Sequence, residues 1–164
     1  MEKIALVSGG ARGIGRAAAE IFIENGFKVI ILDRDVEELN KTCKQIVGTV
    51  PFNYDVSDEK SMKEVSCRVD GEFGRLDCLI NNAGIADFGP IEECNSKQWR
   101  TVMETNLDGV FYLSQSLIPQ LKKTKGSIVN IASISGLRGS TLRVAYGTSK
   151  AAVSYTHLRA HETI

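Results

Sequence analysis

The sequence has no excess of charge of either sign. Its 164 residues include 20 Lys and Arg against 20 Asp and Glu, so the formal net charge at pH 7 is zero. A chain without a dominant charge creates no overall field that recruits nucleic acid or a membrane surface. We therefore expect neither nucleic acid nor a membrane as a partner.

Long apolar runs and paired cysteines are also absent. No run approaches the roughly 20 apolar residues that cross a bilayer, and IALV at residues 4–7 is too short for the core of a secretory signal. The cysteines show neither a CxxC pair nor zinc-like spacing, which predicts reduced thiols and a cytoplasmic protein; they are Cys43, Cys67, Cys78 and Cys94. A catalytic cysteine is the weaker alternative.

A metal-binding pattern is present but incomplete. The two histidines, His157 and His161, lie four residues apart and precede Glu162. Such a pair can share a zinc ion, but no third ligand is evident, and HLRAH lacks the glutamate of the HExxH motif. We therefore expect no metal site.

Short apolar runs alternate with longer periodic segments along the chain. This alternation predicts an α/β fold of the Rossmann type, a doubly wound parallel sheet with helices on both faces. Strands are expected at 3–8, 27–33, 49–56, 76–84 and 126–133, and helices at 13–25, 35–46, about 57–71, 96–122 and from about 144. Ligands of such sheets bind at the carboxyl ends of the strands. Without a repeat or linker, residues 1–153 read as one incomplete nucleotide-binding domain.

The segment SGGARGIG (8–15) directly follows the first expected strand. Gly9, Gly13 and Gly15 fit the pattern TGxxxGxG, with Ser8 in place of the threonine. Glycines permit a tight turn and a close approach of the backbone to a pyrophosphate, which the next helix N-terminus favours. An ordinary strand–helix turn is the alternative, but the position between a buried strand and an amphipathic helix favours a nucleotide site.

Asp33 ends the second expected strand, eighteen positions after Gly15. A carboxylate there can accept hydrogen bonds from the adenosine ribose and would repel a 2′-phosphate, which favours NAD over NADP. Arg12 and Arg34 argue the other way, because either guanidinium could bind a phosphate. A helix-capping Asp33 and two solvated arginines are the simpler alternatives.

A Tyr–Lys pair lies near the start of the last expected helix. Tyr146 and Lys150 are four residues apart, hence on one helix face. A tyrosine of pKa about 10 is a poor proton carrier at neutral pH, and a nearby ammonium group lowers that pKa. Such pairs also occur by chance on surface helices. Ser133 closes the fifth expected strand, thirteen residues before Tyr146.

Together these motifs resemble the classical short-chain dehydrogenase/reductase family, from Met1 to about Val153. Asp55-Val56 is similar to its adenine-contacting pair, and Asn81-Asn82-Ala83-Gly84 to its NNAG segment. The cofactor-binding residues that the resemblance and the motifs imply are Ser8, Gly9, Arg12, Gly13, Ile14, Gly15, Asp33, Arg34, Asp55, Val56, Asn82, Ala83, Gly84, Tyr146 and Lys150.

The resemblance also implies an oxidoreductase that transfers a hydride between NAD(P) and a small alcohol or ketone. In it, Tyr146 would exchange the proton with the substrate oxygen, Ser133 would hydrogen-bond that oxygen, and Lys150 would bind the nicotinamide ribose. Asn106 matches a fourth catalytic position, which holds a water. Ser133 capping a turn and Asn106 as a buried amide bonded to backbone are the simpler alternatives.

The substrate is less determined than the reaction. The general pattern resembles the 3-oxoacyl-carrier-protein reductase-like branch, and the complete form is expected to be a homodimer or homotetramer. Arg138 and Arg143 could face an anionic group, but solvated arginines are the simpler interpretation. A nucleotide-binding pseudoenzyme or regulator on the same fold remains the alternative function.

The last eleven residues, SYTHLRAHETI (154–164), break the amphipathic pattern of the helix before them. They are similar to a translated sequencing-library adapter, so we expect a non-native tail. By resemblance, a sixth strand, a substrate-binding segment and a seventh strand would belong here. The 164-residue chain itself is therefore expected to be inactive.

Overall fold

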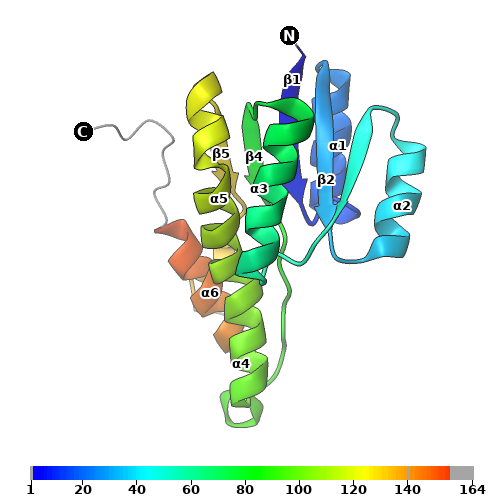
Figure 1. Cartoon of the computed structure of the whole chain (residues 1–164). Helices are drawn as coiled ribbons and strands as arrows, with labels where there is room; N and C mark the ends of the chain where they lie inside the picture. The colour runs from blue at the N-terminus through cyan, green and yellow to red at the C-terminus, as the bar shows by residue number, and fades with distance from the viewer. Residues whose placement is uncertain (1, 140, 156–164) are drawn as a thin grey trace.

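The computed structural model describes residues 2–139 and 141–155, and its centre is one parallel sheet (Figure 1). Its five strands have the order β3-β2-β1-β4-β5. Their bounds are β1 Lys3–Ser8, β2 Phe27–Asp33, β3 Thr49–Asn53, β4 Cys78–Asn81 and β5 Ser127–Asn130. After β3 the chain crosses to the other side of β1, so the carboxyl ends of β1 and β4 flank the point where the strand order reverses, as in the predicted Rossmann-type fold.

Helices cover both faces of this sheet (Figure 1). They are α1 Gly13–Glu24, α2 Val36–Gln45, α3 Glu59–Phe73, α4 Ser96–Met103, α5 Gly109–Thr124 and α6 Val144–Ser154. A π-helical segment, η2 (Glu104–Asp108), joins α4 to α5, and two short 3-10 turns, η1 (Ile91–Glu93) and η3 (Ile134–Gly136), lie in loops. In the part of the chain that is described, no helix is both long and apolar enough to cross a membrane.

Alternate residues of the central strands supply two hydrophobic cores. Ile4 and Leu6 of β1 pack toward α3 and α5, where Leu113 is fully buried. Ala5 and Val7 point to the opposite face, toward α1 and α2. Burying one such side chain contributes roughly 1.5–3 kcal/mol. This burial on both faces explains why β1 is almost continuously apolar.

Four expected elements differ from the observed ones. The third strand ends at Asn53 rather than at residue 56, and the fourth spans 78–81 rather than 76–84. The fifth strand ends at Asn130 rather than at residue 133, so Ser133 does not close it but lies at the start of η3. Tyr54–Val56 and Asn82–Gly84 leave the sheet because they line a pocket at its edge. The helix expected at 96–122 is divided by η2, whose Asn106 side chain bonds the neighbouring loop.

Candidate active site

The glycine-rich loop after β1 requires glycine at defined positions. Gly9 and Gly13 have positive φ angles of 61° and 55°, which side-chain-bearing residues rarely adopt. Gly15 is restricted by space instead, because a Cβ there would lie 2.3 Å from the Gly9 carbonyl oxygen. Arg12 makes no side-chain cap for α1, so the first N–H groups of the helix stay available to an anion at the pocket.

The loop after β4 is tied to the glycine loop. The Asn82 side chain donates hydrogen bonds of 3.0 Å to the carbonyl oxygens of Ser8 and Gly9. The Ser8 hydroxyl accepts the backbone N–H groups of Asn82 and Ala83, each at 3.1 Å, and donates to the Ile80 carbonyl. The motif SGG and the motif NNAG therefore form one bonded unit.

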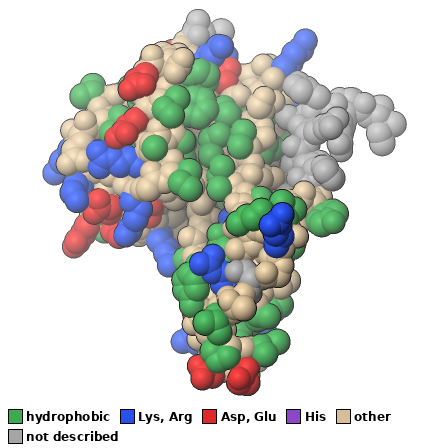
Figure 2. Space-filling model, turned by 180° about the vertical axis from the view of Figure 1, so that it is seen from behind, with side chains coloured by type: hydrophobic (Ala, Val, Ile, Leu, Met, Phe, Trp, Pro, Cys, Tyr) green, Lys and Arg blue, Asp and Glu red, His purple; other side chains and the backbone are tan. Residues whose placement is uncertain are grey.

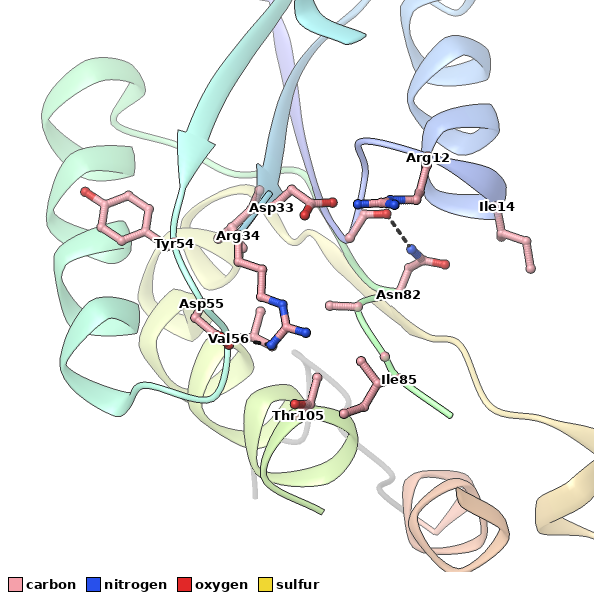
Figure 3. A pocket seen from close by; sticks show the side chains of 14 residues that line it. Arg12, Ile14, Asp33, Arg34, Tyr54, Asp55, Val56, Asn82, Ile85 and Thr105 are labelled. Atoms are coloured by element: carbon pink, nitrogen blue, oxygen red, sulfur yellow. Dashed lines mark hydrogen bonds and ion pairs between the residues drawn. The ribbon is translucent and has the colours of Figure 1, made fainter. Parts of the chain in front are cut away.

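A pocket of about 510 Å³ opens at the carboxyl edge of β1, β2 and β4 (Figure 3). Ten of the residues that the sequence singled out for the cofactor line it: Gly9, Arg12, Ile14, Asp33, Arg34, Asp55, Val56, Asn82, Ala83 and Gly84. Ser8, Gly13 and Gly15 shape the loop without lining the pocket. The remaining lining residues, missed by sequence reasoning, are Leu32, Tyr54, Ile85 and Thr105. Each is directly adjacent in sequence to a predicted site residue, and that adjacency is the signal that could have found them.

The charged side chains of this pocket are arranged around Asp33. Its carboxylate accepts the backbone N–H groups of Ala11 at 3.2 Å and Asp35 at 3.1 Å. Both arginines pair with other acids, Arg12 with Asp35 and Arg34 with Asp55 at 3.3 Å.

Asp55 is ionised in this setting. Burial alone would raise the pKa of its carboxyl group, but hydrogen bonds from Ser57 and the neighbouring Arg34 together hold that pKa below its usual value. Asp55 therefore carries its negative charge at neutral pH, beside the guanidinium of Arg34.

These features fit a dinucleotide. The helix N-terminus and the crowded Gly15 form a surface that backbone, rather than side chains, presents to a phosphate. Asp33 supplies an acceptor at the end of β2, where a ribose hydroxyl would be bound. A bound dinucleotide would thus be held by the glycine loop, Asp33 and the loop after β4.

Asn106 connects this pocket to the last helix. Its Oδ1 accepts the Ile85 N–H at 2.8 Å, while its Nδ2 donates to the Ile85 carbonyl at 2.9 Å and to the Ser149 hydroxyl at 3.0 Å. The Ser149 hydroxyl in turn donates to the carbonyl oxygen of Tyr146 at 2.8 Å. The Asn106 side chain is therefore a buried amide that joins the Ile85 backbone to Ser149 of α6.

Lys150 is an almost fully buried ammonium group, 4% exposed. Its Nζ donates a hydrogen bond of 2.7 Å to the Ile131 carbonyl, and burial lowers the pKa of the amine. A Cβ at Gly84, which lines the pocket, would lie 3.5 Å from this Nζ and 3.2 Å from Asn106 Oδ1. Lys150 Nζ thus lies next to Gly84 of the pocket, although neither Lys150 nor Tyr146 lines the pocket itself.

Ser133 and Tyr146 come from the two segments that pack beside Lys150. The Ser133 hydroxyl accepts the Ser135 N–H at 3.2 Å and so caps η3. η3 packs directly on α6, since a Cβ at Gly136 would lie 2.6 Å from the Ala151 nitrogen. Tyr146, half-buried, lies one helical turn before Lys150 on α6.

Neither a metal centre nor a disulfide is seen in the described part of the chain. There, no group of three His, Cys, Asp or Glu side chains could hold a metal ion. His157 and His161 lie outside the described residues. All four cysteines are free thiols. Burial raises the pKa of the Cys43 and Cys78 thiols, which makes these two poor nucleophiles.

Comparison with known proteins agrees with this site. The family model described as short chain dehydrogenase matches residues 3–163. The chain is 35% identical to L-fucose dehydrogenase of Bos taurus, covering 93% of this chain and 57% of that protein. It is 36% identical to a 3-oxoacyl-acyl-carrier-protein reductase of Thermotoga maritima (92% and 63% covered). It is 38% identical to an NADP-dependent (R)-specific alcohol dehydrogenase of Lentilactobacillus kefiri (92% and 62% covered).

A solved structure shows the same fold. The crystal structure of a short-chain dehydrogenase from Streptomyces avermitilis superposes with a TM-score of 0.87 at 33% identity, covering 93% of this chain and 57% of that one. The chain therefore spans about 60% of the length of the relatives it matches. The family match, the parallel sheet and the glycine loop lead to one conclusion: this chain belongs to the short-chain dehydrogenase family.

Proposed function

We propose that the complete protein transfers a hydride between NAD and a small alcohol or ketone. The observation that carries this proposal is the meeting of two sites: Gly84 lines the nucleotide pocket, and Lys150 Nζ lies directly behind it. Burying a cation costs free energy, and buried charges with a shifted pKa are found most often at functional sites. The family assignment supports the same reaction class.

The bound nicotinamide would supply or accept the hydride. Tyr146, one helical turn before Lys150 on α6, would exchange a proton with the substrate oxygen, and Lys150 would bind the nicotinamide ribose. The Ser133 oxygen accepts the Ser135 N–H, and its hydroxyl would donate to the substrate oxygen. Asn106 would support the reaction by holding the loop at Ile85 and the helix residue Ser149 in place through its hydrogen bonds.

NAD is favoured over NADP as the cofactor. Asp33 faces the pocket without an ion pair to either arginine in the described chain, and its charge would repel a 2′-phosphate. The family does not decide this point, since one relative at 38% identity is named as NADP-dependent.

The substrate is proposed only as an alcohol or carbonyl compound. The relatives are named for L-fucose, for a 3-oxoacyl-acyl-carrier protein and for an alcohol, so their names agree on a dehydrogenase or reductase and differ in the substrate. We also propose that the complete protein is a homodimer or homotetramer. Exposed apolar side chains at Ile91, Trp99 and Phe111 support this assembly.

The proposal is tested with Tyr146→Phe in the complete protein. Loss of the proton carrier should lower turnover by at least about 100-fold, while NADH affinity, measured by fluorescence titration, stays within about twofold. Wild-type turnover in the mutant would refute the role of Tyr146. A wild-type protein that binds NADH but turns over no member of an alcohol and ketone panel would instead be a nucleotide-binding regulator.

A further inference from the structure

We propose that Asp35 determines which adenine nucleotide the pocket accepts, by keeping Arg12 from a 2′-phosphate. The inference rests on the nucleotide site of the proposed function and adds a residue that lies outside the pocket lining. Arg12 is the one basic side chain of the glycine loop and lines the pocket. Its guanidinium pairs with the carboxylate of Asp35 at the start of α2.

The two oxygens of Asp35 have separate partners. Oδ1 accepts the Glu38 N–H at 3.1 Å and so caps α2, while Oδ2 receives the Arg12 guanidinium. The backbone N–H of Asp35 donates to the Asp33 carboxylate at 3.1 Å. Asp35 is thus held by the helix cap and by its backbone bond to Asp33, and its second oxygen pairs with Arg12, one of the residues that line the pocket in Figure 3.

The charges at this end of the pocket favour a 2′-hydroxyl. Asp33, Asp35 and Asp55 supply three carboxylates, whereas Arg12 and Arg34 supply two guanidinium groups, each already paired. A 2′-phosphate would meet the unpaired charge of Asp33 and would have to displace an acid from an arginine. Removal of the Asp35 charge leaves two acids against two arginines and releases Arg12.

Helix capping does not by itself account for Asp35. A cap needs one acceptor oxygen, which asparagine also provides at similar stability. The second oxygen of Asp35 has Arg12 as its partner, whereas the negative charge also interacts favourably with the N-terminus of α2. Asp35→Asn therefore keeps the cap and removes the ion pair, so the two roles can be separated.

The experiment compares two probes that carry only the adenosine end of the cofactor, 5′-AMP and adenosine 2′,5′-bisphosphate. The 164-residue chain suits this test because every pocket residue lies between Gly9 and Thr105. Affinities are measured by isothermal titration calorimetry at low salt. We expect wild type to prefer 5′-AMP, and Asp35→Asn to shift the affinity ratio toward the bisphosphate by about two- to fivefold, the range for one exposed charge pair.

Two control variants define the cause. Asp35→Asn combined with Arg12→Gln should lose the shift, because the freed guanidinium is then absent. Asp70→Asn removes an acid paired with Lys123 at 2.8 Å on α3 and α5, outside the residues that line the pocket, and should leave the ratio unchanged. Thermal melts followed by circular dichroism confirm that each variant folds.

The results that overturn the inference are distinct from those that overturn the proposed function. An unchanged ratio in Asp35→Asn, a shift that survives Arg12→Gln, or a wild type that already prefers the bisphosphate each refutes the role of Asp35 while the nucleotide site stands. A folded wild type that binds neither probe refutes the nucleotide site itself, and the role of Asp35 with it.

Discussion

Lys150 combines burial with positive charge, and the two have opposite effects on the protein. Burial lowers the pKa of this amine from its ordinary value of 10.5. The folded chain therefore binds fewer protons than the unfolded chain between the lowered pKa and 10.5, so this residue makes stability rise with pH across that interval. Below the lowered pKa, the full cost of burying the ammonium is present.

Replacement of Lys150 by methionine should therefore stabilise the fold while it abolishes turnover. An apolar side chain of similar length removes the cost of burying a charge, and we expect this gain to exceed the loss of the hydrogen bond to the Ile131 carbonyl by about 1 kcal/mol. The melting temperature at pH 7 should rise by roughly 2–4 °C per kcal/mol. Between pH 7 and pH 10, the melting temperature of Lys150→Met should rise less than that of the wild type. Lys123→Met, at an exposed ion pair on α5, is the matched control. A lower melting temperature for Lys150→Met alone would contradict this account.

Asp77 is a second residue whose charge is coupled to folding. Burial would raise the pKa of its carboxyl group, but hydrogen bonds from Arg75, at 2.5 and 3.0 Å, and from the Ile4 N–H, at 2.8 Å, keep the pKa below its usual value. Its backbone also bonds Ile4 and Ser127, so it joins β1, β4 and β5.

We expect Asp77→Asn to lower the free energy of unfolding by about 1–3 kcal/mol at pH 7, the cost of disrupting a buried hydrogen bond to a charged group. A depressed carboxyl pKa stabilises the fold above the unfolded value of 3.8 and ceases to do so as pH falls through the folded value. Urea unfolding at pH 7 and pH 3 checks this. The difference in the free energy of unfolding between wild type and Asp77→Asn should be smaller at pH 3 than at pH 7. An equal difference at both pH values would show that the charge of Asp77 does not contribute to stability.

At the scale of elements, the turn from β1 into α1 contains two glycines needed for different reasons. Gly13 has a positive φ angle, but a Cβ added there would meet no atom within 4 Å, whereas Gly15 is crowded by Gly9 and Asn82. Gly13→Ala should therefore cost about 1 kcal/mol of backbone strain. Gly15→Ala should force the loop apart and reduce NADH affinity by at least about tenfold, since the surface that meets the phosphate is displaced.

Fluorescence titration with NADH and thermal melts of both variants test this difference. Nucleotide binding should fall much more in Gly15→Ala than in Gly13→Ala, because only the first moves the backbone that faces the phosphate. Equal losses of affinity would show that the backbone conformation at Gly13, rather than the space at Gly15, determines binding.

The arrangement of strands and helices was predictable because burial on two faces leaves a strong pattern in the chain. Continuous apolar runs at 3–8 and 27–33 became β1 and β2 with the expected bounds. The π-helical segment η2 was not predictable, because a single π-helical turn hardly changes the spacing of apolar residues from that of a continuous α-helix. The cause lies in the long-range bonds of Asn106 to Ile85, which no local pattern reveals.

The candidate site was also predictable only in part. Motif residues such as Gly9, Asp33 and Asn82 line the pocket as predicted, because each follows a strand and the strand ends meet at one edge. The pairing of Arg12 with Asp35 could not be inferred from the sequence, since two residues 23 positions apart meet only after β2 has paired with β1. Which side chains of different elements meet depends on the register in which β1 and β2 pair.

At the scale of the whole molecule, β5 is an open edge of the sheet. Among the described residues it pairs only with β4, and its Val129 side chain is 43% exposed. Figure 2 shows the molecule from behind, and hydrophobic side chains are gathered on the side of the molecule that faces the viewer there. Open, apolar strand edges are templates for pairing between copies.

We therefore expect the 164-residue chain to self-associate as its concentration rises, and Val129→Lys to reduce that association. A charged side chain on an edge strand opposes pairing without removing any buried contact. Light scattering against concentration measures the effect, and an unchanged melting temperature shows that the fold is retained. Equal scattering by mutant and wild type would place the contact elsewhere.

The residues that line the nucleotide pocket all precede Asn106 in the chain, whereas Ser133, Tyr146 and Lys150 follow it. During synthesis, the binding half therefore leaves the ribosome before the chemical half exists. A dinucleotide that binds this nascent half would favour its folded form by mass action. The cofactor would then act first as a folding ligand and only later as a reactant.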